Sequence, residues 1–293
     1  MRAAAAGRPR LTGRRRPGAT ARDEVLDAAG ELFTTCGYTA TSTRQVAEAV
    51  GIRQASMYHH FATKDDVLEA LLTGTVSDSL AAGARLAELP LRADVRLHAL
   101  TWFDARQLWD SPWNLGILYL LPEVRTARFE PFHRQRDQLR LRYRELTRAV
   151  LAELPPPGEG VLAPDPDDDV VFRLAETLPN LRADGLGRPD QPLRIADLGL
   201  HLLGWRGDWT AVRAASAAVL AGLPVQYGGA VGTLAASSGS GGRPARRAGR
   251  GAGAADHRRA LVHRPAAIAD VAGVLGAAAG VGGQPLAARR VLS

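Results

Sequence analysis

Residues 41–64 read TSTRQVAEAVGIRQASMYHHFATK and contain two short helical patterns joined at a glycine. The spacing of Ser42 and Gln45 is that of a capping box, which predicts a helix beginning at Ser42. Gly51 permits a tight turn between this helix and a second one predicted over residues 53–60. A helix, a glycine turn and a short polar helix together predict a helix-turn-helix.

The outward face of the second predicted helix carries side chains that suit a DNA major groove. A Gln can bind an adenine edge with two hydrogen bonds, an Ala methyl group can meet thymine, and a Ser can bond a base or a phosphate. Tyr, His and Lys side chains reach phosphates, which position a helix without reading sequence. The residues of this face are Arg53, Gln54, Ala55, Ser56, Tyr58, His59 and His60.

Two further helices are expected around this unit. A stripe of apolar residues over 22–35 predicts one helix, and Gly37 follows where a helix C-terminus needs positive φ. Cys36 lies on that stripe and is expected to be buried. Thr63 is a good N-cap for the other helix, which is predicted to continue up to Leu89 before Pro90.

These residues resemble the DNA-binding domain of the TetR/AcrR-type transcriptional regulators. The family motif Gly-(hydrophobic)-x-x-x-(Ser/Thr)-(hydrophobic)-Tyr-x-(His/Tyr)-Phe-x-x-Lys fits without a gap. Its fixed positions fall on Gly51, Ser56, Tyr58, His60, Phe61 and Lys64. The detailed match covers residues 22–72, about a sixth of the chain. The helical region up to Leu223 is similar to the family only in architecture.

The resemblance implies a homodimeric repressor that binds a pseudo-palindromic operator on double-stranded DNA. The cytoplasmic location is predicted separately, from the lack of an apolar span and of a signal-peptide pattern. It also implies release by a small, largely apolar or aromatic effector. By position, the phosphate contacts are expected to be Thr43, Tyr58 and Lys64. The candidate base-reading residues are Arg44, Gln54, Ala55 and Ser56. His59 and His60 are expected at the DNA backbone, and Arg53 is included as a DNA-binding residue at a variable position. Because Arg53 and Gln54 fall at variable positions of the family motif, the resemblance does not predict which operator sequence this chain binds.

Several of these residues also have purely structural interpretations. Tyr58 and His60 could be core residues, and the Arg44 and Arg53 side chains could be merely solvated. His59 and His60 could suggest a metal site, but adjacent helical residues diverge by about 100°. No third ligand lies near them in sequence, so we predict no metal site and no cofactor.

Length, charge and hydropathy divide the 293 residues into four parts. The formal net charge is +7, residues 1–22 carry +7, and residues 228–293 carry +7, so residues 23–227 carry −7. The segment 1–21 is predicted to be a disordered basic arm and 228–293 a disordered Gly/Ala/Arg-rich tail, with a weak helix near 268–279 as an alternative. Helical spacing recurs between them and strand patterns are scarce, which predicts an all-α fold. The DNA-binding domain is placed at 22–72 and a ligand-binding and dimerisation domain at 73–227.

Aromatic residues gather in the second predicted domain, although they are only 5% of the chain. Aromatic side chains with a few polar groups are typical of an apolar ligand pocket, and equally of an ordinary core. The candidate ligand-binding residues are His98, Trp102, Phe103, Trp109, Trp113, Tyr119 and Phe172.

Other features of this domain have simpler interpretations. The Arg-rich helix expected over 132–154 could bind an anion, but a solvated helix face is favoured. Four carboxylates, Asp165 and Asp167–Asp169, could hold a cation, but the first turn of a helix explains them better. The helices predicted over 167–181 and 193–203 are the candidates for dimerisation, and a last one is expected over 209–223.

Several classes of protein are disfavoured. No stretch approaches the roughly 18–20 apolar residues that span a bilayer, and no signal peptide is expected. One cysteine excludes an internal disulfide. The chain lacks a nucleophile elbow, a P-loop and a His-Glu-x-x-His motif, so an enzyme is not expected. A helical binding protein without DNA recognition is the third alternative.

Overall fold

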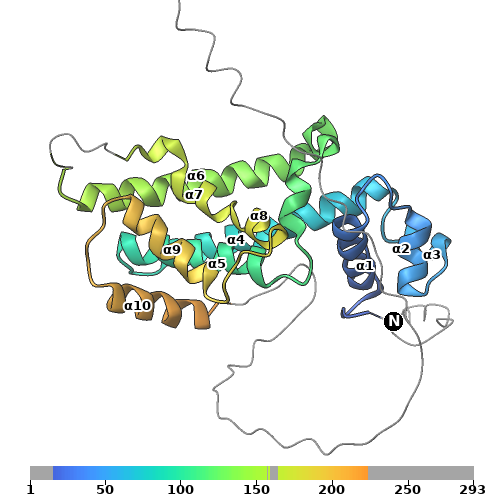
Figure 1. Ribbon diagram of the computed structural model, residues 1–293, viewed down its shortest axis with the longest axis horizontal. Helices are drawn as coiled ribbons and strands as arrows, with labels where there is room; N and C mark the ends of the chain where they lie inside the picture. Colours follow the sequence, from blue (N-terminus) through green and yellow to red (C-terminus); the bar gives the residue numbers. More distant parts are fainter. Residues whose placement is uncertain (1–15, 157, 159–163, 224–293) are drawn as a thin grey trace, which may run out of the picture. The chain divides into compact units, whose positions relative to one another are not determined.

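The computed structural model describes residues 16–156, 158 and 164–223. Within these ranges it contains α-helices and short 3₁₀ helices and no strand, so the all-α prediction is confirmed (Figure 1). The arm predicted at 1–21 lies largely outside the described residues. The tail predicted at 228–293 and its alternative helix near 268–279 lie outside them entirely.

The first three helices form the predicted helix-turn-helix. They are α1 (Ala21–Thr35), α2 (Thr43–Val50) and α3 (Gln54–Tyr58). Ser42 accepts from the backbone N–H of Gln45 and the Gln45 side chain reaches back, so the capping box forms as predicted. Gly51 ends α2 with φ 77°, in the left-handed region. A residue with a side chain would be strained in this backbone conformation.

The core of this unit is apolar and closed. Val25 and Ala29 of α1 and Val46 of α2 are fully inaccessible, and Met57 of α3 packs into the same cluster. The prediction that Cys36 is buried is wrong, because the residue is exposed. Cys36 is the C-cap of α1, one position beyond the last helical turn, so it no longer follows the buried stripe.

The fourth helix, α4 (Lys64–Glu88), begins at the predicted N-cap Thr63 and ends one residue before Leu89. Thr63 and Asp66 form a capping box, and Asp65 and Asp66 occupy the first turn, where carboxylates oppose the positive end of the helix dipole. Its buried face contacts α1 as well as α5 and α6, so α4 belongs to both predicted domains.

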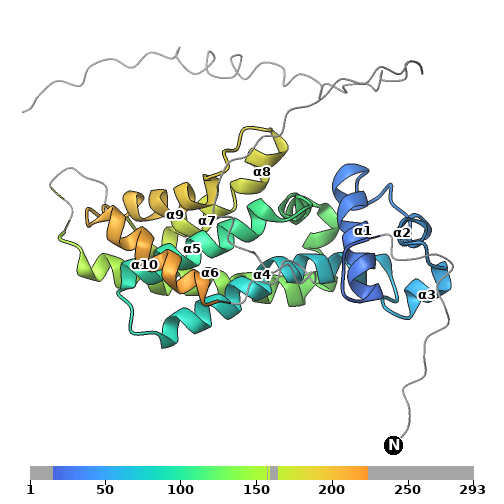
Figure 2. The ribbon, with the colours of Figure 1, turned by 90° about the horizontal axis from the view of Figure 1, so that it is seen from below.

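The remaining elements pack around α5 (Ala93–Asp110), which contacts α4 and each of the later α-helices (Figures 1 and 2). The elements after α5 are η1 (Leu115–Leu120), η2 (Pro122–Arg125), η3 (Ala127–Phe129), α6 (Glu130–Glu153), η4 (Pro166–Asp168), α7 (Val170–Ala175), α8 (Leu178–Ala183), α9 (Gln191–Leu202) and α10 (Trp209–Ala221). Among the described residues, no helix combines the length and apolar character needed to cross a bilayer.

The single helix predicted over 167–181 is wrong. The segment is divided into η4, α7 and α8. Asp169 adopts the left-handed region with φ 57°, which separates η4 from α7. Pro179 has no backbone N–H to donate to the preceding turn, so a new helix starts at Leu178 with proline in its first turn.

The solvated-face interpretation of the Arg-rich helix is wrong for part of α6. Arg136 donates through Nε to Glu176 over 2.8 Å, and Arg144 pairs with the buried carboxylate of Asp169. Arg148 pairs with Asp167. These arginines therefore tie α6 to η4 and α7, and they also explain the acidic run that follows the Pro/Gly loop.

Candidate DNA-binding interface

The turn at Gly51 presents α3 with its polar side chains outward. Met57 alone of the five α3 residues is buried, while the others are exposed. Exposure extends to the flanking positions Arg53, His59 and His60, and to Arg44 on α2. The arrangement leaves these polar side chains accessible on one side of the helix-turn-helix.

Three predicted contact residues are joined in one cluster that links α2 to α3. The Gln54 Nε2 donates to Thr43 Oγ1 over 2.9 Å and to Tyr58 Oη over 3.2 Å. The Thr43 and Tyr58 hydroxyls are 3.1 Å apart. Tyr58 is 46% exposed, so its alternative interpretation as a core aromatic does not hold. The cluster holds these side chains in place before any DNA arrives.

Lys64 occupies a structural position that the sequence reasoning missed. Its Nζ donates to the backbone carbonyls of Tyr38 and Thr41, each over 3.0 Å, and lies 4.1 Å from the centre of the Tyr38 ring. A Lys ammonium has three donors, so one remains for a phosphate. Lys64 thus fastens the start of α4 to the loop between α1 and α2.

The basic side chains around α3 are mostly unpaired. Arg44 donates to Glu48 over 2.8 Å, in an exposed pair that contributes little to stability. Arg53, His59 and His60 form no side-chain hydrogen bond or ion pair with the described residues. Among those residues no group of three or more potential ligands is placed to hold a metal ion.

Taken together, a capped two-helix unit with an exposed, preorganised polar face defines a DNA-binding transcriptional regulator of the helix-turn-helix class. A family model described as "Bacterial regulatory proteins, tetR family" matches residues 25–71. The solved structure of Mycobacterium smegmatis AmtR is 52% identical, with a TM-score of 0.65, and the match covers 71% of this chain and 98% of that one. The chain belongs to the TetR family, whose members are regulators and not enzymes.

Two other relatives are more distant. The transcriptional repressor KstR2 of Rhodococcus jostii is 42% identical over 57 residues, which are 20% of this chain and 28% of that protein. The chain therefore matches only about a quarter of the length of this curated relative. The regulator PfmR of Thermus thermophilus is 23% identical with a TM-score of 0.51, covers 64% of this chain and all of that one, and shows the fold alone.

The structure does not bring the predicted ligand-binding residues into one site. His98 is fully buried and bonded on both ring nitrogens, to Ser216 at 2.9 Å and Asp197 at 3.2 Å, so it joins α5 to α9 and α10. Burial lowers the pKa of His98, which favours the neutral ring. Phe103 is a core residue of α5. Trp102 packs edge-on against His98, with ring centres 6.1 Å apart.

Two of the predicted residues do meet around one cation. The Arg136 guanidinium lies 5.9 Å from the Tyr119 ring centre and 5.4 Å from that of Phe172. Trp109 instead packs on Gly187, where an added Cβ would overlap the indole, and Trp113 packs on α1. Tyr119 and Phe172 are therefore the two predicted ligand-binding residues that meet at one location, and Arg136 between them was not among the predicted residues.

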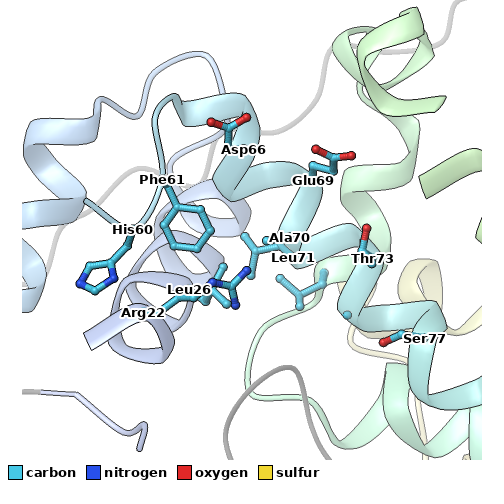
Figure 3. A pocket seen from close by; sticks show the side chains of 12 residues that line it. Arg22, Leu26, His60, Phe61, Asp66, Glu69, Ala70, Leu71, Thr73 and Ser77 are labelled. Carbon is cyan, nitrogen blue, oxygen red and sulfur yellow. The ribbon is translucent and has the colours of Figure 1, made fainter. Parts of the chain in front are cut away.

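A pocket lies elsewhere, between α1, the end of α3 and α4 (Figure 3). It has a volume of about 570 Å³. Arg22 stacks on Phe61 at 4.8 Å inside it. Its other lining residues are Leu26, His60, Asp66, Glu69, Ala70, Leu71, Thr73, Gly74, Ser77 and Leu115. None of the seven residues predicted to bind ligand lines this pocket.

A buried polar cluster between α4, α5 and α6 was also missed. The carboxylate of Asp104 accepts from Ser79 Oγ at 2.6 Å and from Tyr143 Oη at 3.0 Å. Gln107 Nε2 donates to the same Ser79 hydroxyl over 2.9 Å. Burial raises the pKa of Asp104 to about 6. Its sequence signal is an acidic residue, Asp104, between the apolar residues Phe103 and Ala105.

Proposed function

We propose that this chain is a homodimeric repressor that leaves a pseudo-palindromic operator when a small, largely apolar or aromatic molecule binds the part after α4. The observation that carries the proposal is the exposed polar face of α3, with Gln54 held by Thr43 and Tyr58. The 52% identity to AmtR over most of that protein supports a regulator, and the name of KstR2 supports repression.

In the proposed complex α3 enters the major groove by its N-terminus. Gln54 would pair with an adenine edge through its amide, and Ala55 and Ser56 lie beside it. This requires the Gln54 Nε2 to leave one of its two hydroxyl acceptors, and the Thr43 and Tyr58 hydroxyls would bond phosphates by donating their O–H groups. Lys64 would use its third donor for a phosphate, and His59, His60, Arg44 and Arg53 border the same face.

For dimerisation we propose the outer surface of α9, one of the two predicted helices, with α10 in place of the segment over 167–181. The helices α9 and α10 lie beside each other in Figure 1 and are joined by the Arg213–Asp197 ion pair. Leu198 is 39% exposed and Leu202 is 47% exposed on α9. The exposed residues of α10 are mostly small and apolar, among them Ala211, Ala214 and Ala218, with Thr210 and Arg213 beside them. A second copy would remove this apolar surface from water and place two α3 helices about 34 Å apart, or a multiple of it.

The effector is proposed to bind near Arg136, where Tyr119 and Phe172 supply aromatic surface. The buried Asp104 cluster lies on the helices that contact this region and offers hydrogen-bonding groups to a polar substituent. Release by a factor of about 100 needs about 2.7 kcal/mol of differential binding between the DNA-competent state and the other state.

The proposal is tested by fluorescence anisotropy of DNA taken from upstream of the chain's own gene, with excess competitor DNA at fixed salt. The full chain should bind this DNA specifically, and Gln54→Ala should lose specificity. Gln138→Ala, an exposed glutamine on α6, is the matched control and should bind like the wild type. If competitor DNA abolishes binding equally for the wild type, Gln54→Ala and Gln138→Ala, α3 does not read sequence. That result would favour a helical binding protein without DNA recognition.

A further inference from the structure

A single carboxylate on α1 connects the helix-turn-helix to the part of the chain that follows α5. Asp27 accepts from the Trp113 indole N–H through Oδ1 over 2.9 Å. It accepts from Arg16 through Oδ2 over 3.0 Å. Its side chain is only 12% exposed. Both oxygens are therefore engaged, one by each of two segments far apart in the sequence.

Arg16 extends the connection to the turn that carries α3. Its other guanidinium nitrogens bond Glu31 on α1 and, through Nε, the backbone carbonyl of Ala49 over 3.3 Å. Ala49 lies two residues before the left-handed Gly51. An unbroken series of hydrogen bonds thus runs from Trp113 through Asp27 and Arg16 to Ala49 in the last turn of α2, next to the Gly51 turn that precedes α3.

The contact between Trp113 and α1 is close enough to constrain the sequence of α1. A Cβ added at Gly30 would lie 2.9 Å from Trp113 Cδ1. Glycine inside a helix costs about 0.5–1 kcal/mol relative to alanine. Because residue 30 is a glycine, the Trp113 indole lies directly against the backbone of α1. In this position the indole N–H reaches Asp27.

Trp113 is also connected to the interior of the later domain. The backbone N–H of Leu115, at the start of η1, donates to the Trp113 carbonyl over 2.8 Å. Further along η1, Tyr119 bonds Thr75 of α4 and packs on Phe132 of α6 with ring centres 5.4 Å apart. A displacement of η1 relative to α4 and α6 would therefore also move the Trp113 indole, which lies only two residues before η1.

We propose that Trp113, Asp27 and Arg16 form a hydrogen-bonded relay through which the later domain sets the position of the turn before α3. Asp27 and Arg16 are positioning residues for DNA recognition, because they act through Ala49 and not by touching a base. The relay rests on the DNA binding that the family assigns to this chain. It does not depend on which effector is bound or on whether the protein represses.

A double-mutant cycle on DNA affinity tests the relay. Trp113→Phe removes the indole N–H and keeps a ring against Gly30, while Arg16→Gln removes the guanidinium. Kd is measured with the full chain on a DNA sequence selected from a random pool. We expect Trp113→Phe to raise Kd roughly fivefold when Arg16 is present, the order found for directly coupled residues, and by less than about 1.5-fold in the Arg16→Gln background. Any direct contact of Arg16 with DNA cancels in the cycle.

Trp109→Phe is the matched control, because Trp109 packs on Gly187 and its side chain forms no hydrogen bond to α1 among the described residues. Its effect should be the same in both backgrounds. Hydrogen exchange gives a second readout: the amides of Gly51 and Ile52, which bond Glu48 and Ala47, should exchange faster in Trp113→Phe than in Trp109→Phe. Additive effects of Trp113→Phe and Arg16→Gln, or equal non-additivity with Trp109→Phe, would overturn the relay. A general loss of folding would instead show as faster exchange throughout α1 and α2 in both tryptophan variants.

Discussion

The side-chain amide of Gln54 donates to the hydroxyl of Thr43 over 2.9 Å, so the first residue of the recognition helix is tied to the first residue of α2. The bond fixes the direction of a long, flexible side chain before DNA binds, which reduces the entropy lost on recognition. It also means that Gln54 must exchange one hydroxyl for a base when it reads an adenine edge.

Gln54→Ala should relax base preference at one operator position and cost about 1–3 kcal/mol there. Thr43→Val should act differently, because it removes both a proposed phosphate contact and the acceptor that holds Gln54. It should weaken binding to every sequence and, in addition, reduce the discrimination at the Gln54 position. Competition with single-base operator variants measures both effects. If Thr43→Val leaves discrimination unchanged, the Gln54–Thr43 bond has no part in recognition.

Lys64→Ala should lower both stability and DNA affinity. The loss of two charge-assisted bonds to the Tyr38 and Thr41 carbonyls should cost about 1–2 kcal/mol of unfolding free energy. Loss of one phosphate contact should reduce the slope of log K against log salt by about 1. Arg85→Ala, an exposed cation further along α4, should change neither quantity. An unchanged slope with reduced stability would show that Lys64 is purely structural.

Asp104→Asn should change how stability depends on pH. The folded-state pKa of Asp104 is raised to about 6, above its ordinary value of 3.8, so the folded state holds this proton more tightly. Its contribution to stability is therefore greatest below pH 4 and falls by about 3 kcal/mol as pH rises through 6. Urea unfolding at pH 4 to 7 should show the wild type losing this amount relative to Asp104→Asn. The exposed Asp137→Asn should follow the wild type, and parallel curves for Asp104→Asn would contradict the assignment.

Leu198→Asp combined with Leu202→Asp should dissociate the proposed dimer, since two charges would be buried without partners at its centre. Sedimentation velocity on the full chain should then report the mass of one chain. Leu141→Asp on α6 is the control, because Leu141 is 51% exposed, slightly more than Leu198 and Leu202, but lies on another helix. A double variant that sediments like the wild type would place the interface elsewhere.

The helix-turn-helix was predictable from sequence because its signals are local. The Ser42–Gln45 capping box, the Thr63 N-cap and the positive φ of Gly51 each depend on residues within a few positions. The resemblance to the TetR family rests on the same short stretch, and the comparisons confirm it.

The later domain was less predictable because its contacts span long sequence distances. His98 bonds Ser216, and Arg136 bonds Glu176. The sequence around His98 and Arg136 does not indicate which distant residue each of them bonds. Aromatic composition alone could not separate Trp109, packed against Gly187, from Tyr119 and Phe172 around Arg136. Pro179 is a sequence signal for the break between α7 and α8. The apolar residues spaced along 167–181 nevertheless favoured a single helix.

Selection of bound sequences from random DNA would show whether α3 reads DNA sequence as part of a two-fold symmetric dimer. The full chain should enrich a pseudo-palindromic motif whose half-sites are separated by about one helical turn, or a multiple of it. Repeating the selection with Gln54→Ala should erase preference at one symmetric pair of positions and keep the rest. If the wild type enriches no motif, or if Gln54→Ala enriches the same motif in full, α3 does not read sequence as described.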